Sequence, residues 1–94
     1  MDDTEIKVKQ IIAGLDFCRK PFDSLLITDS LGYDLGMDSL AAIEFLVALE
    51  ENFTIVLTDE EILEQDTWMQ TVGSVIQFIE QKTKMSAPAH ERVI

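Results

Sequence analysis

The chain has 94 residues, of which 47% are apolar, and a formal net charge of −11 at pH 7. This length allows one domain with a modest core, and the apolar fraction is too high for a disordered acidic tail. The charge argues against nucleic acid and anionic membranes as partners, because both would repel an acidic surface. Proteins with basic patches are the expected partners.

Cysteine usage and the apolar runs bear on location. Cys18 is the only cysteine, so no intramolecular disulfide can form, and a reducing, cytoplasmic location is expected. The acidic residues 1–5 lack the apolar stretch of a signal peptide. The longest apolar run, residues 45–49, is far too short to span a membrane.

The spacing of apolar residues predicts a first helix from about Thr4 to Arg19. Its apolar positions recur at intervals of three and four residues: Val8, Ile11, Ile12, Leu15 and Cys18. Acidic residues lie near its start, while Arg19 and Lys20 lie near its end, as the helix dipole favours. Pro21 then restricts Lys20 and ends the helix.

Residues 21–38 form a long connection that is too apolar for a free linker. Pro21, Gly32 and Gly36 interrupt regular structure there. Large apolar side chains are spread along it: Phe22, Leu25, Leu26, Ile27, Leu31 and Leu35. We therefore expect this loop to pack over the core, and it could include a short helical turn near Asp23–Leu26.

A second helix is predicted from Ser39 to about Asn52. With about 100° per residue, one side collects the core positions, which are Ala42, Phe45, Leu46, Leu49 and Phe53. The solvent side should carry a narrow apolar strip with acidic edges, formed by Leu40, Ile43, Glu44, Val47 and Glu51. Exposed apolar strips with polar borders are candidate contact surfaces.

Residues 58–61, Thr-Asp-Glu-Glu, form a capping box that predicts a short third helix ending near Gln65. A loop over Asp66–Gln70 should follow. Trp68 lies in this loop, where packing against the helices is favoured over contact with a partner.

The last helix should begin after Thr71, whose hydroxyl can cap it, and end around Lys82 or Lys84. Its apolar face is formed by Val72, Val75, Ile76 and Ile79, with Phe78 beside them. No strand pair is indicated. The predicted fold is all-α: a small four-helix bundle of three main helices and one short helix, with a long loop between the first and second. The domain should span residues 1–84, followed by a flexible C-terminal tail at 85–94.

Ser39 lies where the loop becomes the second helix, in a strongly acidic part of the chain. From Pro21 to Gln81 there are thirteen acidic residues and no Lys or Arg. Asp38 and Ser39 both favour helix starts, so the pair alone can be explained as a cap. However, N–H groups at a helix N-terminus also bind phosphate well, and a serine there could carry a phosphodiester.

Other chemistries lack the residues that they require. A hydrolase elbow needs glycines two positions before and after the serine, but Met37 and Ala41 occupy those positions. The only histidine, His90, lies in the predicted tail, so no general base is near. The acidic loops that start at Asp29 and Asp34 lack the ligands of an EF-hand, and no zinc spacing occurs. No catalytic residue and no metal site are predicted.

Two further residues have less specific signals. Cys18 falls on the apolar stripe of the first helix, which favours a core residue over a reactive thiol. Tyr33 could pack down or flank a group attached to Ser39, and the sequence pattern does not decide between the two.

Residues 35–40, Leu-Gly-Met-Asp-Ser-Leu, resemble the phosphopantetheine attachment motif of acyl carrier proteins. The likeness continues in order through Ile43-Glu44, Leu49-Glu50-Glu51, Phe53, residues 58–61, Thr71-Val72, Val75 and Phe78-Ile79. Asp-Ser-Leu alone is a weak signal, whereas this ordered series, over about residues 4–82, is a strong one.

The resemblance implies a covalent 4′-phosphopantetheine on Ser39, with Asp38 as the flanking acid of the motif. A magnesium-dependent phosphopantetheinyl transferase would supply it from coenzyme A: the Ser39 hydroxyl attacks the pyrophosphate and becomes a phosphodiester. The thiol of the arm would then carry acyl groups as thioesters in polyketide or fatty acid biosynthesis. The chain itself would be a monomer and not an enzyme.

The resemblance also implies that the second helix docks the transferase, acyltransferase, ketosynthase or other acyl-processing enzymes. The family's contact positions match Leu40, Glu44, Val47 and Glu51, with Ile43 beside them. These are the residues of the exposed strip.

Departures from the family pattern bear on the subtype. Ala41 stands where carriers of fatty acid synthesis often have an acid, and the region 65–70, with Trp68, is longer than usual. Residues 36–39, Gly-Met-Asp-Ser, are nearer to acyl than to peptidyl carriers, which remain the alternative within the family. We therefore favour a discrete carrier of a polyketide or other secondary-metabolite pathway. Outside the family, the alternative is an acidic helical adaptor without a cofactor.

Overall fold

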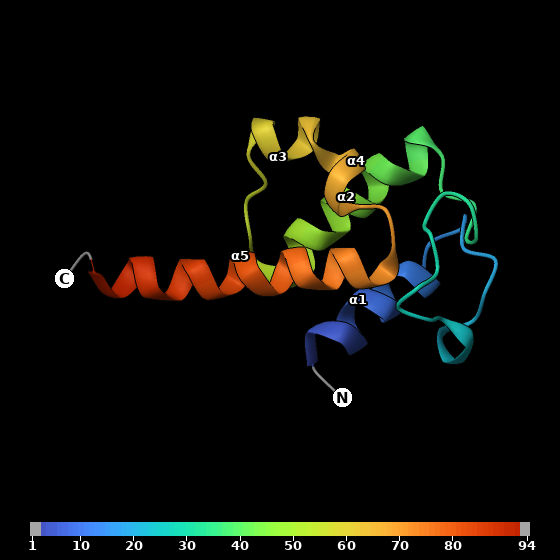
Figure 1. Cartoon of the computed structure of the whole chain (residues 1–94), viewed down its shortest axis with the longest axis horizontal. Coiled ribbons are helices and arrows are strands. Elements are labelled where there is room, and N and C mark those ends of the chain that lie inside the picture. Colours follow the sequence, from blue (N-terminus) through green and yellow to red (C-terminus); the bar gives the residue numbers. More distant parts are fainter. Residues whose placement is uncertain (1–2, 93–94) are drawn as a thin grey trace.

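The computed structural model describes the backbone of residues 3–92 and the side chains of residues 3–83. This part of the chain forms five α-helices and one 3-10 turn (Figure 1): α1 (Asp3–Ala13), η1 (Phe22–Ser24), α2 (Ser39–Phe53), α3 (Asp59–Leu63), α4 (Gln65–Trp68) and α5 (Val72–Arg92). No strand occurs in these residues, and the only bridge is an isolated one between Ser30 and Thr71. The all-α class and the small bundle with a long loop after the first helix are confirmed.

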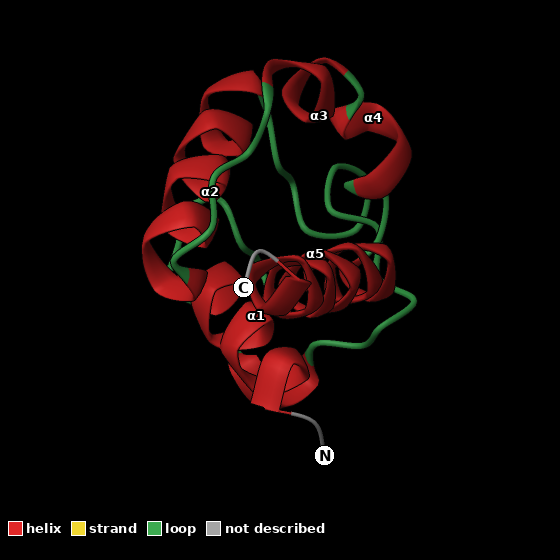
Figure 2. Cartoon of the chain, turned by 90° about the vertical axis from the view of Figure 1, so that its left-hand side faces the viewer, coloured by secondary structure: helices red, strands yellow, loops and turns green. Residues whose placement is uncertain are grey.

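Three helices enclose most of the core. α1 contacts both α5 and α2, and Figure 2 shows α2 along one side of the bundle, with α1 and α5 beside it. The fully buried side chains are Val8, Ile12, Leu31, Leu35, Phe45, Leu49, Val72, Val75 and Ile79. Two of them, Leu31 and Leu35, come from the long loop, so the loop packs over the core as its apolar content predicts.

α1 ends at Ala13, so the prediction of a helix to Arg19 is wrong. The N–H of Gly14 makes the last helical bond, 3.1 Å to the carbonyl of Gln10. Glycine costs about 1 kcal/mol relative to alanine inside a helix. The helix therefore stops at the one residue in its predicted range that weakens it most.

Leu15 and Cys18 keep helical spacing although they lie beyond α1. Both are partly buried against the core from a series of turns, so the apolar period continues where the helical backbone does not. Cys18 packs as a core residue, as expected, and its thiol donates to the carbonyl of Lys20 at 3.2 Å. Arg19 and Lys20 lie in these turns and not at a helix end.

α2 begins at Ser39 and ends at Phe53, close to the predicted bounds. The Asp38 carboxylate caps it by accepting the Ala41 N–H at 2.8 Å. Thr54 ends it with a left-handed conformation, φ 52°. The inward side matches the predicted core: Phe45, Leu46 and Leu49 are buried, and Ala42 and Phe53 are half-buried.

The capping box at α3 forms as predicted. The hydroxyl of Thr58 accepts the Glu61 N–H at 3.1 Å, and the Glu61 carboxylate accepts the Thr58 N–H at 2.9 Å. Lys82 of α5 lies 2.8 Å from the same carboxylate. Burial raises the pKa of Glu61, but the hydrogen bonds from Lys82 and Thr58 lower it by more, so its net pKa lies below the ordinary value.

α4 occupies part of the predicted loop over Asp66–Gln70, so that part of the prediction is wrong. A helix of one turn leaves no apolar period to detect in the sequence. Trp68 ends it and is buried: its indole N–H donates to the Glu61 carbonyl at 3.0 Å, and its ring stacks on Phe78 with centroids 3.9 Å apart. Packing against the helices, the favoured role for Trp68, is confirmed.

α5 begins after Thr71, as predicted. The Thr71 hydroxyl accepts the Ser74 N–H, and the Ser74 hydroxyl accepts the Thr71 N–H, both at 3.0 Å. The helix continues to Arg92 instead of ending around Lys82 or Lys84. The flexible tail at 85–94 stays a prediction, since its side chains lie outside the described residues. No helix within residues 3–92 combines the length and apolar character needed to cross a membrane.

Asp29 fastens the long loop to the bundle. Its buried carboxylate lies 2.9 Å from the Lys20 ammonium and accepts the Leu26 N–H at 2.9 Å. Its backbone carbonyl accepts the N–H of Val72, the first residue of α5, at 3.0 Å. The hydrogen bond from Lys20 lowers the pKa of Asp29 by more than burial raises it. One residue thus joins the turn after α1, the loop and α5.

Replacing Asp29 with Asn should lower the free energy of unfolding at neutral pH by about 1–3 kcal/mol, because Lys20 loses its charged partner. The native pKa of Asp29 lies below its ordinary value of 3.8. The stabilisation that the ionised Asp29 carboxylate provides is therefore complete above pH 3.8, and it is lost as the pH falls through the native pKa. The difference between wild type and Asp29→Asn should therefore shrink in acid. Urea unfolding from neutral to strongly acidic pH measures it, with exposed Asp23→Asn as the control. Equal stability of the two variants at neutral pH would contradict the account.

Candidate functional site

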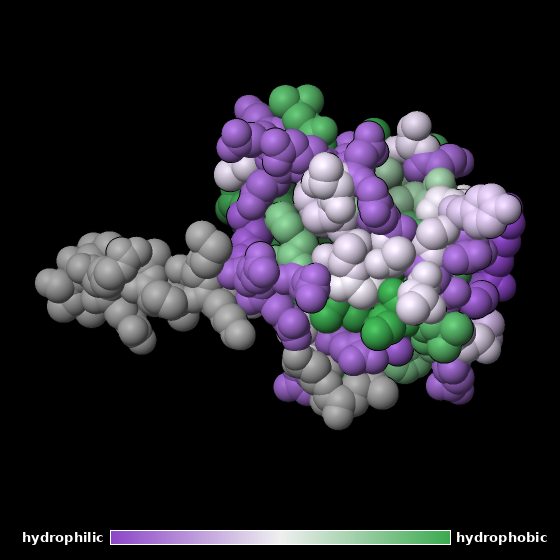
Figure 3. Space-filling model, in the orientation of Figure 1, coloured by the Kyte–Doolittle hydropathy of each residue, from purple (hydrophilic) through white to green (hydrophobic). Residues whose placement is uncertain are grey.

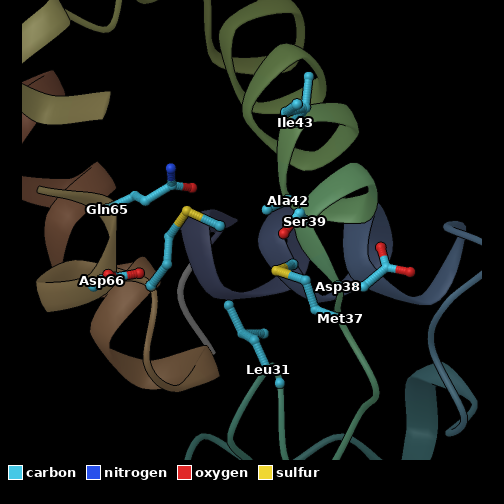
Figure 4. A pocket seen from close by; sticks show the side chains of 10 residues that line it. Leu31, Met37, Asp38, Ser39, Ala42, Ile43, Gln65 and Asp66 are labelled. Carbon is cyan, nitrogen blue, oxygen red and sulfur yellow. The ribbon is translucent and has the colours of Figure 1, made fainter. Parts of the chain in front are cut away.

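Ser39 is exposed and is the first residue of α2. Asp38 supplies the side-chain cap of this helix, so the Ser39 hydroxyl is not needed for that purpose. Figure 4 shows Ser39 at the edge of a groove. The Asp38 carboxylate points away from Gln65 and Asp66, which lie across this groove. The two residues that both favour helix starts therefore have different roles: one caps, and the other presents its hydroxyl.

The groove beside Ser39 has a volume of about 490 Å³. Ala42 and Ile43 of α2 form one wall, and Gln65 and Asp66 of α4 form the wall opposite (Figure 4). The remaining lining is largely apolar and comes from Leu31, Met37 and Met69, with Gly32 and Asp38. A chain attached to Ser39 would thus meet an apolar floor and a polar far wall.

The backbone before Ser39 makes a tight turn at Gly36, where φ is 91°. L-residues with a side chain rarely adopt this conformation. The site is also crowded, because a Cβ at Gly36 would lie 2.9 Å from Nε of Arg19. After the turn, the Met37 N–H donates to the Leu31 carbonyl at 2.9 Å, which ties the start of α2 to the buried part of the loop.

The outer face of α2 exposes the strip that the sequence predicts. Leu40 is 67% exposed, Ile43 58% and Val47 48%. Glu44 and Glu51 are exposed as well. A second hollow of about 430 Å³ lies along this face, where Ile43, Glu44 and Val47 meet the turn at residues 14–16. The five predicted contact residues therefore share one solvent-facing surface that begins next to Ser39.

The remaining candidates are placed as follows. Tyr33 is 89% exposed, so it does not pack down on the loop. His90 lies outside the residues whose side chains are described. Among the described residues, no group of three or more His, Cys, Asp or Glu side chains could hold a metal ion.

Sequence reasoning missed two parts of the site. Arg19 lies against Gly36 although seventeen positions separate them, and nothing in a single sequence signals that approach. The groove wall of Gln65 and Asp66 depends on α4, which has no sequence period. The sequence did predict that Gly36 interrupts regular structure, three positions before the helix that begins at Ser39.

Comparison with known proteins settles the family. Residues 7–79 match the family described as "Phosphopantetheine attachment site". The chain is 38% identical over 81 residues to an acyl carrier protein of Clostridium acetobutylicum, a match that covers 83% of this chain and 94% of that protein. The chain belongs to the acyl carrier protein family. Members carry covalently attached 4′-phosphopantetheine, which is the cofactor of this chain.

Other relatives agree with this assignment. An acyl carrier protein of Desulforapulum autotrophicum is 36% identical over 83 residues, covering 84% of this chain and 96% of that protein. A protein of Schizosaccharomyces pombe, named as a mitochondrial acyl carrier protein, is 31% identical over 77 residues. That match covers 82% of this chain but only 64% of the fission yeast protein. Proteins of this family interact with phosphopantetheinyl transferases and acyl-processing enzymes.

Gly36→Ala should destabilise the carrier by about 1–3 kcal/mol, because the positive φ remains strained even if the Arg19 side chain moves away. Gly32→Ala is a matched control in the same loop: its Cβ would lie 3.7 Å from the Met37 carbonyl oxygen, an ordinary contact. Urea unfolding of both variants measures the difference. A Gly36→Ala variant as stable as Gly32→Ala would show that the turn is not strained.

Proposed function

We propose that the chain is a non-catalytic carrier that holds acyl intermediates as thioesters on a 4′-phosphopantetheine arm attached to Ser39. It delivers them to partner enzymes of polyketide or fatty acid type biosynthesis. The observation that supports this best is the exposed Ser39 hydroxyl, which stands at the start of a long helix and beside a groove.

The residues present fit the cofactor. A phosphodiester on Ser39 would lie at the N-terminus of α2, where N–H groups and the helix dipole favour a negative charge. The Asp38 carboxylate would not compete for Ser39, because it bonds the Ala41 N–H. The groove leaves space next to the hydroxyl for an attached chain. When bound, the group supplies the thiol that carries the acyl chain.

The proposal assigns no catalysis to the chain itself. The only histidine of the sequence is His90, far along the chain from Ser39, and the nearest carboxylate in sequence, Asp38, is occupied as a cap. Activation of the Ser39 hydroxyl is therefore assigned to the transferase. What the chain contributes is a fixed, accessible position for the reacting oxygen.

The outer face of α2 is the proposed docking surface for these enzymes. Its exposed apolar side chains can be buried by a partner, while Glu44 and Glu51 can face Lys or Arg on that partner. The net charge of −11 would speed the encounter with a basic enzyme surface. The position of the face next to Ser39 brings a docked enzyme close to the attachment point.

Within the family, we favour a carrier of polyketide or other secondary metabolism over one of fatty acid synthesis. Ala41 directly after Ser39-Leu40 and the long region 65–70, with Trp68, support this assignment. The chain is proposed to act as a monomer. The proposed location is the cytoplasm, which the single cysteine, Cys18, supports, although one relative is named as mitochondrial.

Incubation with coenzyme A, magnesium and a broad-specificity phosphopantetheinyl transferase should raise the intact mass by one phosphopantetheine group. Ser39→Ala should abolish the gain, because within residues 3–83, whose side chains are described, no other exposed serine stands at the first position of a long helix. Ser24→Ala, at an exposed serine of η1, is the control and should still gain the mass. Absence of any gain in folded wild type would refute the proposed function and leave an acidic adaptor as the alternative.

Glu44→Lys or Val47→Asp should weaken the binding of a partner enzyme by about 1–2 kcal/mol, roughly 5- to 30-fold in affinity, without altering the fold. Both side chains face water, so the substitutions change the surface and leave the core intact. Glu60→Lys and Val56→Asp, at exposed positions on and before α3, make the same chemical changes elsewhere. Steady-state kinetics of the transferase with each carrier measures the effect. Equal KM values for all four variants would argue against α2 as the docking face.

A further inference from the structure

Tyr33 is the most exposed large apolar side chain of the described residues, at 89%. It lies in the long loop that leads into α2. Figure 3, drawn in the orientation of Figure 1, shows mainly hydrophilic to neutral surface along the right-hand edge, where this loop runs. Aromatic rings that are surrounded by polar groups are frequent contact points between proteins, because they offer a large area to bury.

Hydrogen bonds hold the turn around Tyr33 in one shape. The Ser30 hydroxyl accepts the N–H groups of both Tyr33 and Asp34, each at 3.0 Å. In return, the Asp34 carboxylate accepts the Ser30 N–H at 2.8 Å. Leu31 and Leu35, on either side of the turn, are fully buried and anchor it in the core. The backbone that carries the ring is therefore already ordered, which lowers the entropic cost of binding through it.

The turn lies beside the attachment point. Gly32, directly before Tyr33, lines the same groove as Ser39. The Gly36 N–H donates to the Gly32 carbonyl at 3.2 Å, and the three residues from Gly36 to Ser39 span at most about 11 Å even when extended. A standard interface buries about 800 Å² on each partner, which is a disc of about 16 Å radius. A partner centred on Ser39 would therefore reach the turn that carries Tyr33.

The reaction at Ser39 selects the partner that covers this surface. Proteins of this family interact with phosphopantetheinyl transferases, and such an enzyme must bring coenzyme A to the Ser39 hydroxyl. Its surface then lies over the residues around that hydroxyl. On α2 these include Leu40, which is 67% exposed, and on the loop they include Tyr33. The attachment point thus has an exposed apolar side chain on the helix and another on the loop that precedes it.

We propose that Tyr33 is a contact residue for the phosphopantetheinyl transferase. Its ring fixes the loop side of the complex, while the exposed strip on α2 fixes the helix side. Held at both edges, the transferase is oriented with its active site over the Ser39 hydroxyl. Tyr33 is assigned to docking and not to catalysis. The assignment rests on the proposed attachment of phosphopantetheine to Ser39.

A fluorine label at Tyr33 tests the contact directly. Tyr33 is the only tyrosine of the chain, so 3-fluorotyrosine labels this position alone. The labelled, full-length Ser39→Ala variant is titrated with transferase, without coenzyme A, to concentrations far above the KM for the wild-type carrier. The fluorine resonance should shift or broaden saturably, because the ring is covered on docking. A resonance that does not respond, or that responds only in wild type after loading, would overturn the proposal.

Tyr33→Ala should raise the KM of the transferase for the carrier at least about fivefold and leave kcat nearly unchanged, because ring area is lost from the interface and the reacting atoms are untouched. Tyr33→Phe keeps the ring and should stay close to wild type. Val56→Ala is the control: it shortens an exposed apolar side chain that does not line the Ser39 groove, and its KM should equal that of wild type.

Urea unfolding should show equal stability for Tyr33→Ala and wild type, since the ring is exposed, and this separates weaker docking from loss of the fold. Equal KM values for Tyr33→Ala and Val56→Ala would overturn the proposal. The intact mass of wild type is measured on the same samples. Loading with equal KM values would refute only the contact, whereas no loading at all would refute the carrier function and the contact with it.

Discussion

The buried carboxylate of Asp29 is the contact on which the arrangement of the loop depends. It joins Lys20, the Leu26 N–H and, through its own carbonyl, the start of α5. The segment that it fixes continues into Leu31, whose N–H donates to the Gln70 carbonyl at 3.0 Å. Such buried charges are costly without a partner, and here each oxygen has one. Because the loop is tied down on this side, its other end can present Ser39 in one position.

At the start of α2, the residues that shape and cap the helix differ from the serine that is exposed for modification. Gly36 turns the chain, Asp38 caps the helix, and Met37 ties the turn to the buried Leu31. Ser39 is left exposed beside a groove. This arrangement suits a modified residue, since a large group on Ser39 disturbs neither the cap nor the core. It also places the modified residue at the edge of the exposed strip on α2, where a docked enzyme would meet it.

The sequence predicted the features that depend on neighbours along the chain. The capping box at Thr58, the bounds of α2 and the exposed strip on it all follow from local chemistry or from the helical period. The end of α1 was missed because Leu15 and Cys18 keep that period while packing from turns, so the apolar pattern does not show where the helical backbone stops. α4 and the contact of Arg19 with Gly36 could not be predicted, because both depend on tertiary packing. For the same reason, Leu26 and Ile27 were expected to pack over the core, whereas their backbone hydrogen bonds hold them exposed.

The central claim is that Ser39 carries the phosphopantetheine group. Locating the modification within the chain tests this claim most directly. After loading from coenzyme A, proteolytic fragments can be sequenced by tandem mass spectrometry. The account predicts one phosphopantetheine group, on the fragment that contains Ser39 and on the Ser39 side chain itself. A group on Ser24, Ser30 or Ser74, or an unmodified Ser39 in protein that is otherwise folded, would contradict it.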